Sequence, residues 1–199
     1  QRSRGLGDVY KRQCYKLVPI KTTVDESNPY QMGMVDSEKM LSIVKNWSWG
    51  KKDGIDIYYD VESRKNSITY RGNISRLIDQ LILENRNEEA EIILDLCMTK
   101  MPVNEFGYYT LVEPLINSYY VIDKKEKARK IFDEIAVKYQ ENLFYYSSIS
   151  NSNKNRYAED IYTGIERYRS LVDVIINYED GEYLETRMKE FNDYLDLFL

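Results

Sequence analysis

Residues 85–102, with the sequence NRNEEAEIILDLCMTKMP, decide the fold of this chain. Apolar side chains recur in this stretch at the spacing of one face of a helix. These apolar residues are Ala90, Ile93, Leu94, Cys97, Met98 and Met101. Asn85 and Glu88 have the spacing of a capping box, which starts a helix, and Pro102 cannot continue one. The stretch therefore predicts an amphipathic helix from Glu88 to Met101.

The same face returns 38 residues further on, where Ala128 takes the place of Ala90. Asp123 and Glu126 repeat the spacing of Asn85 and Glu88, and the apolar face of the preceding helix repeats as well. In the first copy that preceding face contains Ile74, Leu77, Ile78, Leu81 and Ile82. The apolar residues of the second copy are Val112, Leu115, Ile116, Tyr119, Tyr120, Ala128, Ile131, Phe132, Ile135, Ala136 and Tyr139. Agreement of both faces at one offset predicts an internal repeat of a helical hairpin.

The pattern from residue 61 onward predicts a mainly α fold. Gly72 interrupts the first helix, over residues 62–84, at a cost of about 1 kcal/mol relative to alanine. Pro114 predicts that the next helix starts near it or kinks there. Residues 61–146 are thus expected to form two hairpins, followed by a polar loop over 147–156. Two hairpins leave an apolar face uncovered, so we expect a C-terminal helical hairpin, over 157–199, to cap this α-solenoid fragment.

The N-terminal part of the chain lacks this helical pattern. Residues 1–13 have no apolar period, and we interpret them as translated adapter sequence of the sort found in assembled environmental reads, and expect them to be disordered. On that interpretation the natural chain is entered near Cys14 and the sequence is a fragment. Residues 14–60 are expected to be irregular, with a strand-like run at 15–20 and one short helix that Asp36 opens and that runs to Trp47.

Composition excludes some classes of function. The 199 residues carry a net charge of −5, which argues against a nucleic-acid partner because such a partner favours a basic face. The sequence contains no apolar run of the ~18 residues that a membrane span needs, and no signal peptide opens it. The chain has two cysteines and no histidine, so we expect Cys97 to be a core residue and expect neither a metal site nor a cofactor.

Few residues suggest chemistry, and we expect no catalytic residue in this chain. Without histidine the usual general base is absent, and no nucleotide-binding, nucleophile-elbow or CxxC motif is present. The acidic residues near Glu88 and the basic cluster of Lys124, Lys125, Lys127 and Arg129 are interpreted as solvated helix faces. Trp47 and Trp49 alternate in a turn and are the candidate ligand-binding residues, because their rings could stack on a sugar. The alternative is that they anchor the N-terminal segment.

The repeat resembles the tetratricopeptide repeat. In that family a small residue of the second helix is followed four positions on by a large apolar residue and eight further on by proline. Ala90, Leu94 and Pro102 match this pattern, and so do Ala128 and Phe132, but Gln140 replaces the second proline. Two features depart from the family pattern. The period is 38 rather than about 34 residues, and Ile78 and Ile116 take the place of the small residue expected in the first helix of each hairpin. The resemblance implies tetratricopeptide-like hairpins with looser packing between paired helices.

Four further stretches resemble a second family. Read in order, YKLVPI at 15–20, GMVDSEKM at 33–40, WSWG at 47–50 and the repeat ending in CMTKMP look like the C-terminal tail of bacterial multi-span membrane proteins of the protein O-mannosyltransferase-like, glycosyltransferase-C type. The resemblance covers about residues 14–150. It implies that sugar transfer belongs to a membrane half that is absent here, so no catalytic residue can be carried over, and that this tail lies on the periplasmic side.

The predicted function is therefore that of a non-catalytic interaction or docking tail. Its partner would be another protein or the membrane half of its own parent chain. A glycan- or acceptor-binding module that uses Trp47 and Trp49 is the second interpretation, and a free-standing soluble enzyme is the third.

Overall fold

The computed structural model describes residues 35–49 and 57–198. The chain divides into two compact units, Gln1–Lys52 and Asp53–Leu199. The strand-like run at 15–20, the adapter-like residues 1–13, Cys14 and Leu199 lie outside the described residues. Among the described residues the secondary structure is helical and contains no strand.

In the first unit the structure describes one helix, α2 (Ser37–Lys45). The Asp36 side chain accepts a hydrogen bond from the backbone N–H of Lys39 at 3.1 Å, which is the N-cap arrangement. The helix ends two residues before Trp47. The prediction that Asp36 opens a short helix here is confirmed.

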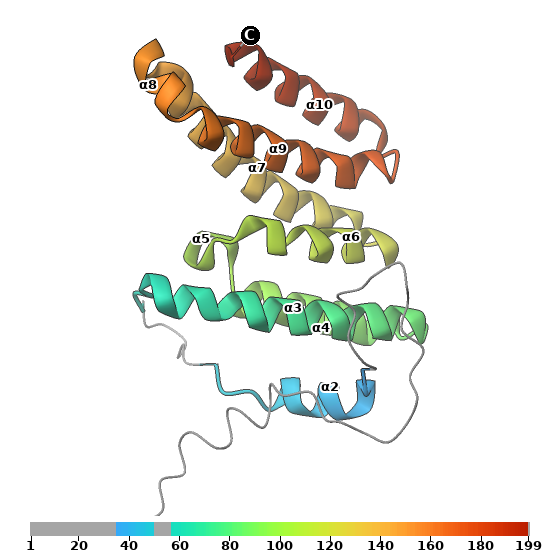
Figure 1. The fold of residues 1–199 in the computed structure, drawn as a ribbon. Coiled ribbons are helices and arrows are strands. Elements are labelled where there is room, and N and C mark those ends of the chain that lie inside the picture. Colours follow the sequence, from blue (N-terminus) through green and yellow to red (C-terminus); the bar gives the residue numbers. More distant parts are fainter. Residues whose placement is uncertain (1–34, 50–56, 199) are drawn as a thin grey trace, which may run out of the picture. The chain divides into compact units, whose positions relative to one another are not determined.

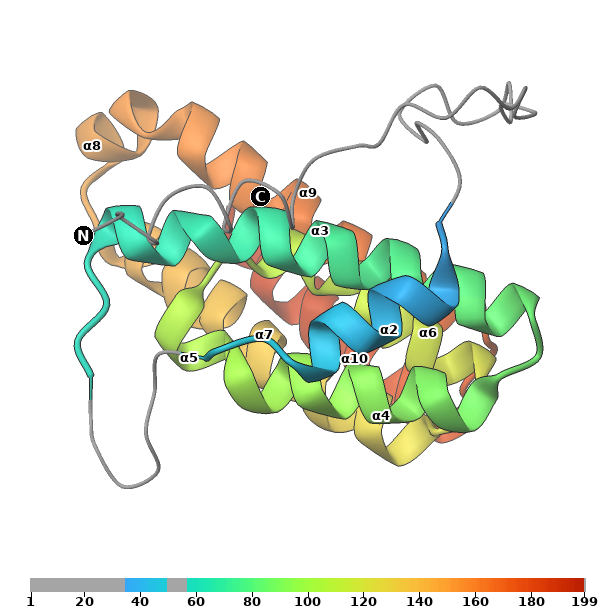
Figure 2. The same cartoon turned by 90° about the horizontal axis from the view of Figure 1, so that it is seen from below.

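The second unit is built from three helical hairpins in chain order, joined by short segments (Figure 1 and Figure 2). The hairpins are α3 (Val61–Leu83) with α4 (Asn87–Lys100), α6 (Glu113–Val121) with α7 (Lys125–Ser148), and α9 (Ala158–Ile176) with α10 (Gly181–Leu195). The connecting elements are α5 (Val103–Phe106), η1 (Tyr109–Leu111), α8 (Asn151–Arg156) and the terminal turn η2 (Asp196–Phe198). Each second helix packs against the first helix of the next hairpin, α4 against α6 and α7 against α9. The predicted mainly α, helical-hairpin fold is confirmed.

The 38-residue repeat describes the core of the first two hairpins. Of the paired apolar positions, all but two have both members buried. The exceptions are Ile82 and Met98, which are half-buried while their partners Tyr120 and Ala136 are buried. Ala90 and Ala128 are both fully buried in the second helix of their hairpin. The apolar faces predicted from the sequence are thus the faces that pack.

The predicted capping boxes are wrong, although the repeat that contains them is real. Asn85 and Asp123 have left-handed backbones with φ of 59° and 60°, a conformation that Asn and Asp tolerate better than most residues. The N–H of Arg86 donates to Leu81 O at 2.8 Å, and the N–H of Lys124 donates to Tyr119 O at 2.8 Å. These are the bonds of a Schellman motif. The two residues therefore end α3 and α6 rather than begin the helices that follow.

The second helices of the two hairpins differ in length because only the first hairpin has a proline at the end of this helix. The helix α4 has 14 residues and is followed closely by Pro102. At the equivalent position Gln140 lies inside α7, which has 24 residues. The Gln140 side-chain amide donates to Tyr168 Oη at 2.7 Å, so the position that stops one helix anchors the other to α9. Pro114 lies in the first turn of α6, as predicted.

Most of the segment expected to be a polar loop, residues 147–156, is helical. Its first two residues end α7, and Asn151–Arg156 form the short helix α8. Ser147 Oγ and Ser148 Oγ donate to the carbonyls of Phe144 and Tyr145, so these hydroxyls are satisfied within the last turn of α7. The polar composition of this segment therefore does not show where α7 ends.

Gly72 does not interrupt α3, which runs continuously through it. A Cβ added at Gly72 meets nothing within 4 Å, so we expect Gly72→Ala to raise the free energy of unfolding by about 0.5–1 kcal/mol, because alanine loses less backbone entropy in a helix. Urea denaturation of the two proteins measures this gain. Gly164→Ala is the matched control: its Cβ would lie 3.4 Å from Leu143 Cδ2, and its gain should be smaller. A loss of stability in Gly72→Ala would contradict the prediction.

Candidate functional site

Trp47 and Trp49, the candidates from the sequence, follow the C-terminus of α2. Both are half-buried, and their ring centroids lie 5.5 Å apart at an interplanar angle of 68°. This edge-to-face contact means that the two rings do not form one flat platform. The structure thus brings the two predicted residues together but does not arrange their rings as parallel stacking surfaces.

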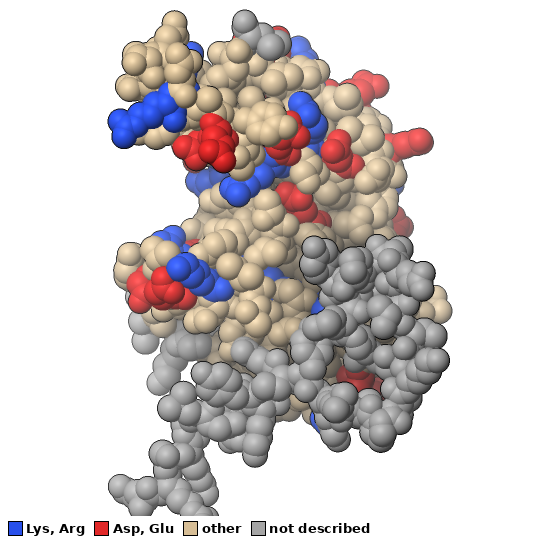
Figure 3. Space-filling model, in the orientation of Figure 1, with Lys and Arg blue, Asp and Glu red and all other residues tan. Residues whose placement is uncertain are grey.

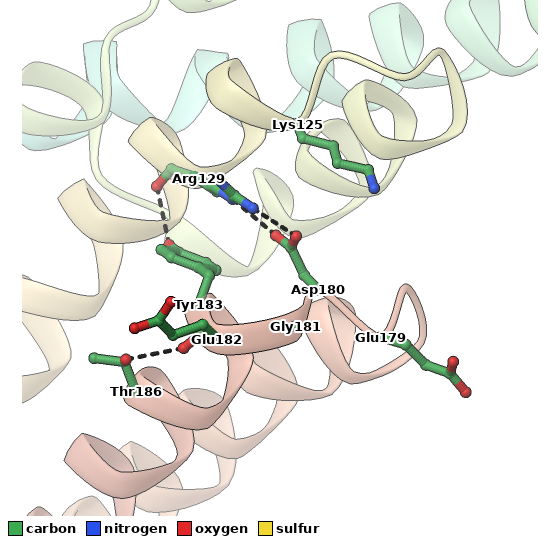
Figure 4. Close-up of a pocket in the computed structure, with 8 residues that line it drawn as sticks. All are labelled: Lys125, Arg129, Glu179, Asp180, Gly181, Glu182, Tyr183 and Thr186. Carbon is green, nitrogen blue, oxygen red and sulfur yellow. Dashed lines mark hydrogen bonds and ion pairs between the residues drawn. The ribbon is translucent and has the colours of Figure 1, made fainter.

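A hollow of the second unit lies where the first turns of α7 and α10 meet the turn after α9. It has a volume of about 510 Å³ and is open to solvent, and Figure 4 shows the residues that line it. Its lining residues are Lys125, Arg129, Glu179, Asp180, Gly181, Glu182, Tyr183 and Thr186. The backbone that shapes it is unusual, because Glu179 and Gly181 have positive φ of 45° and 50°. The sequence predicts a helical hairpin over 157–199 but gives no sign of a hollow beside its turn.

A buried carboxylate lies at the centre of this hollow. Asp180 is 6% exposed, and its two oxygens accept hydrogen bonds from Arg129 Nη2 at 2.7 Å and Nε at 2.9 Å. Tyr120 Oη donates to the same carboxylate at 2.7 Å. In Figure 4 the Arg129 guanidinium points at Asp180, whereas the Glu179 side chain points away. A bidentate pair of this kind is among the stronger polar contacts in proteins.

The charges of this cluster satisfy one another. The Arg129 guanidinium, followed by the Tyr120 hydroxyl, holds the pKa of Asp180 below its usual value against the opposing effect of burial. Hydrogen bonding to Asp180 raises the pKa of Arg129, and burial together with this carboxylate raises the pKa of Tyr120. All three groups are therefore fixed in their ordinary charge states at neutral pH. Such a cluster holds elements together and offers no activated nucleophile or base.

A second polar cluster continues from the hollow along α7 and α10. Tyr183 Oη donates to Asp133 Oδ1 at 2.8 Å, and Arg187 Nη2 lies 2.9 Å from the same oxygen. The guanidinium carbons of Arg129 and Arg187 each lie 5.0 Å from the centroid of the Tyr183 ring. The ring is thus in contact with two cations, a favourable arrangement for its π face.

The same set of groups occurs one repeat earlier. Asp95, at the position of Asp133 less 38 residues, accepts from Tyr119 Oη at 2.8 Å and from Lys127 Nζ at 2.7 Å. In both places an Asp of one hairpin's second helix binds a Tyr and a cation of the next hairpin. We call this Asp–Tyr–cation set the inter-hairpin latch. The first latch is Asp95, Tyr119 and Lys127, and the second is Asp133, Tyr183 and Arg187.

The basic cluster that was interpreted as a solvated face takes part in these contacts. Lys124 Nζ and Lys127 Nζ lie 2.9 and 2.7 Å from the Glu91 carboxylate, and Arg129 binds Asp180. The side chains of Lys124 and Lys127 are 44% and 42% exposed, so these two lysines lie on a solvated face as interpreted, although both are also paired with Glu91. Arg129 departs from the interpretation, because it binds the buried carboxylate of Asp180, 51 residues away. In the view of Figure 3, basic and acidic side chains are interspersed rather than gathered into a patch of one sign.

Each latch is expected to contribute a measurable coupling energy. In a double-mutant cycle of Asp95→Ala with Tyr119→Phe, and in one of Asp133→Ala with Tyr183→Phe, we expect about 0.5–1.5 kcal/mol of coupling in urea unfolding, the usual value of one hydrogen bond. Asp95→Ala with Tyr183→Phe is the control, since these residues share no hydrogen bond, and should give additive losses. If the losses of stability are additive in all three cycles, the Asp and Tyr of each latch are not energetically coupled.

The described residues show little else that could do chemistry. Cys97 is buried, and burial raises the pKa of its thiol to about 12, so it is a core residue and not a reactive thiolate. In the described ranges no group of three or more His, Cys, Asp or Glu side chains could hold a metal ion. Nor does any helix of those ranges have the length and apolar character to cross a membrane.

Comparisons with protein-family models, with curated proteins and with solved structures found no match to this chain.

Proposed function

We propose that this chain is a non-catalytic interaction scaffold, whose hairpins present a docking surface to a protein. The observation that carries this proposal is the exposure of large aromatic side chains on α7. Phe144 and Tyr145 are 63% and 60% exposed, while Phe132, Ile135 and Leu143 of the same helix are buried. Exposed aromatic groups on a well-packed surface are typical of binding sites.

The partner is proposed to be another protein or the membrane half of a parent chain of the O-mannosyltransferase-like type. The resemblance of the stretches at 15–20, 33–40 and 47–50 supports this parent, and with it a periplasmic location. The tetratricopeptide-like nature of the repeat is part of the same proposal, and it is supported by the complete burial of Ala90 and Ala128. Genomic sequence upstream of Cys14 tests the parent directly. Several membrane spans there would support it, whereas a start codon after a short leader would overturn it.

Site-specific photo-crosslinking tests the docking surface. A benzophenone amino acid at Phe144, in cells that make the parent protein, should give a discrete crosslinked product with one partner. The same group at Lys65, whose side chain is 51% exposed on α3, is the control and should give none. If Phe144 and Lys65 give the same products, or none, the proposed docking surface on α7 is wrong.

The purified chain is expected to transfer no sugar from a lipid-linked donor. The reasons are that the buried carboxylate of its hollow, Asp180, is already bound by Arg129 and Tyr120, and that the resemblance assigns transfer to the membrane half. A radiolabelled-donor assay with the chain alone checks this, with the complete parent as positive control. Transfer by the isolated chain would overturn the non-catalytic proposal.

Glycan or acceptor binding through Trp47 and Trp49 is the second candidate function. The half-exposure of both rings favours it. Saturable oligosaccharide binding that Trp49→Ala abolishes would establish it, and titration of a glycan array against both proteins measures this. Binding that survives Trp49→Ala would exclude these rings as the site.

A further inference from the structure

The second and third hairpins meet at a carboxylate of which only one oxygen is hydrogen-bonded. Glu113 is the first residue of α6 and is half-buried. Its Oε2 accepts a hydrogen bond from Ser170 Oγ of α9 at 2.9 Å, whereas its Oε1 is buried and has no hydrogen-bond partner among the described residues. A buried carboxylate oxygen without a partner disfavours the charged form of the group.

A second polar atom is left without a partner near the same junction. Tyr139 of α7 is 5% exposed, and its hydroxyl is buried and forms no hydrogen bond within the described ranges. Burial, followed by the Glu113 carboxylate, raises the pKa of Tyr139, so the two side chains are close enough to interact electrostatically. The hydroxyl nevertheless does not stabilise the Glu113 charge by a hydrogen bond.

The other groups around Glu113 do not neutralise its charge. Arg167 of α9 favours the carboxylate but forms no ion pair with it in the part of the chain that the structure describes, and the N-terminus of α6 favours it as well. Tyr109 of η1, whose ring centroid lies 5.7 Å from that of Tyr139, supplies no positive charge. Within the described residues no charged group of α3 or α4, which also pack against α6, shifts the pKa of Glu113. Burial outweighs Ser170 and Arg167 and raises this pKa.

We propose that the junction of the second and third hairpins is a proton-sensitive contact, which becomes tighter when Glu113 takes up a proton from solvent. The neutral carboxyl still accepts from Ser170 and no longer places an unpaired charge between α6 and α9. Because the pKa of Glu113 is raised in the folded chain, the gain in stability is complete below the ordinary value of 4.5 and is lost as the pH rises through the folded value. The contact thus responds to the acidity of its surroundings, whatever partner the chain binds.

Asp180 responds to pH in the opposite sense. It accepts from Tyr120 near the C-terminal end of α6, and its charged form is the stabilising one, so acid weakens that contact. The third hairpin is therefore attached near one end of α6 by a contact that acid strengthens and near the other end by one that acid weakens. Comparing variants at a single pH removes the contribution of Asp180, which is the same in all of them.

A carbon-13 NMR titration of the full chain tests whether Glu113 takes up a proton as proposed. Its side-chain carboxyl signal, assigned by its absence from Glu113→Gln, should titrate with a midpoint above 4.5. A midpoint at or below this value would overturn the inference.

Urea unfolding measures the effect of the proton on stability. At pH 7 we expect Glu113→Gln to unfold at a higher urea concentration than the unchanged chain, because the amide has the size of the protonated acid and no charge. The difference should disappear below about pH 4, where the unchanged chain is protonated as well. Glu185→Gln is the matched control: it removes the same charge from an exposed position of α10 in a chain of net charge −5, and should shift the midpoint less.

Two results of the urea experiment would contradict the proposal. If Glu113→Gln unfolds at pH 7 no later than Glu185→Gln, then Ser170, Arg167 and the N-terminus of α6 stabilise the charge, and the contact is not tightened by a proton. If the gain of Glu113→Gln persists unchanged in acid, it comes from packing of the amide and not from loss of the charge.

Discussion

Arg71→Met is expected to lower the free energy of unfolding by about 3 kcal/mol, the cost of removing the donor from buried polar groups. Arg71 is fully buried in α3. Its guanidinium donates to Met101 O at 2.8 Å and to Gly107 O at 2.5 Å, and a longer bond of 3.4 Å reaches Tyr108 O. Within the described residues these acceptors are all backbone carbonyls. Removing the donor takes this partner from the carbonyls of Met101 and Gly107, whereas Tyr108 O still accepts from the Leu111 N–H at 3.1 Å.

The position of these carbonyls explains why the loss should be large. Met101 and Gly107 are the C-caps of α4 and α5, where unpaired carbonyls form the negative end of the helix dipole. Arg71 thus takes the place of a capping group for two helices and fixes the segment that joins the first hairpin to the second. Burial lowers the pKa of Arg71, but a guanidinium keeps its proton at any pH at which the protein is studied.

Unfolding of three variants by guanidinium chloride tests this role of Arg71. Arg71→Lys should lose an intermediate amount, because an ammonium group lacks the planar fork that reaches two carbonyls. Lys65→Met is the control on the same helix, since Lys65 makes an exposed ion pair with Glu62, and it should change stability by less than about 0.5 kcal/mol. If Arg71→Met is as stable as the unchanged chain, the carbonyls find other partners and the capping role is wrong.

The buried faces of the helices could be predicted from the sequence because burial repeats with the helical period. The positions of Ile93 and Ile131, or of Leu94 and Phe132, are recognisable in any register that keeps the 38-residue offset. The helix caps could not be predicted from the sequence, because a Ser, Asn or Asp near a helix end can cap either the helix before it or the helix after it. Only the backbone angle shows that Asn85 belongs to the earlier helix.

The polar contacts between hairpins were hidden for a different reason. Arg71 binds carbonyls 30 to 37 residues away, which have no side-chain signature, and Arg129 binds Asp180 51 residues away. In the sequence both arginines look like ordinary solvated helix residues. The first latch could have been suspected, since Asp95 and Asp133 coincide at the repeat offset as a polar pair among apolar ones. Their tyrosine partners, Tyr119 and Tyr183, are not related by the 38-residue offset, so the repeat does not reveal the hydrogen bonds of the latches.

Asp180→Asn is expected to lower the free energy of unfolding by about 2 kcal/mol at neutral pH. The amide keeps the size of the side chain but loses the charge that binds Arg129 at 2.7 Å, and it accepts the Tyr120 hydrogen bond less strongly. Arg129 retains Glu126 at 3.0 Å, so the loss should be smaller than that of Arg71→Met. Because Tyr120 belongs to α6, Arg129 to α7 and Asp180 to the turn before α10, the change loosens the attachment of the last hairpin.

The pH dependence separates this charge effect from a change in packing. The pKa of Asp180 is lowered in the folded chain, so its contribution is fully present above the ordinary aspartate pKa of 3.8 and is lost as the pH falls through the folded value. The difference in stability between the unchanged chain and Asp180→Asn should therefore be constant from neutral pH down to about 5 and should shrink below the ordinary value, because protonated aspartate resembles asparagine. Urea denaturation over this range measures it. Glu179→Gln, at the neighbouring carboxylate that points away from Arg129 (Figure 4), should show no such difference. A loss in Asp180→Asn that persists unchanged in acid would assign the effect to packing rather than to the carboxylate.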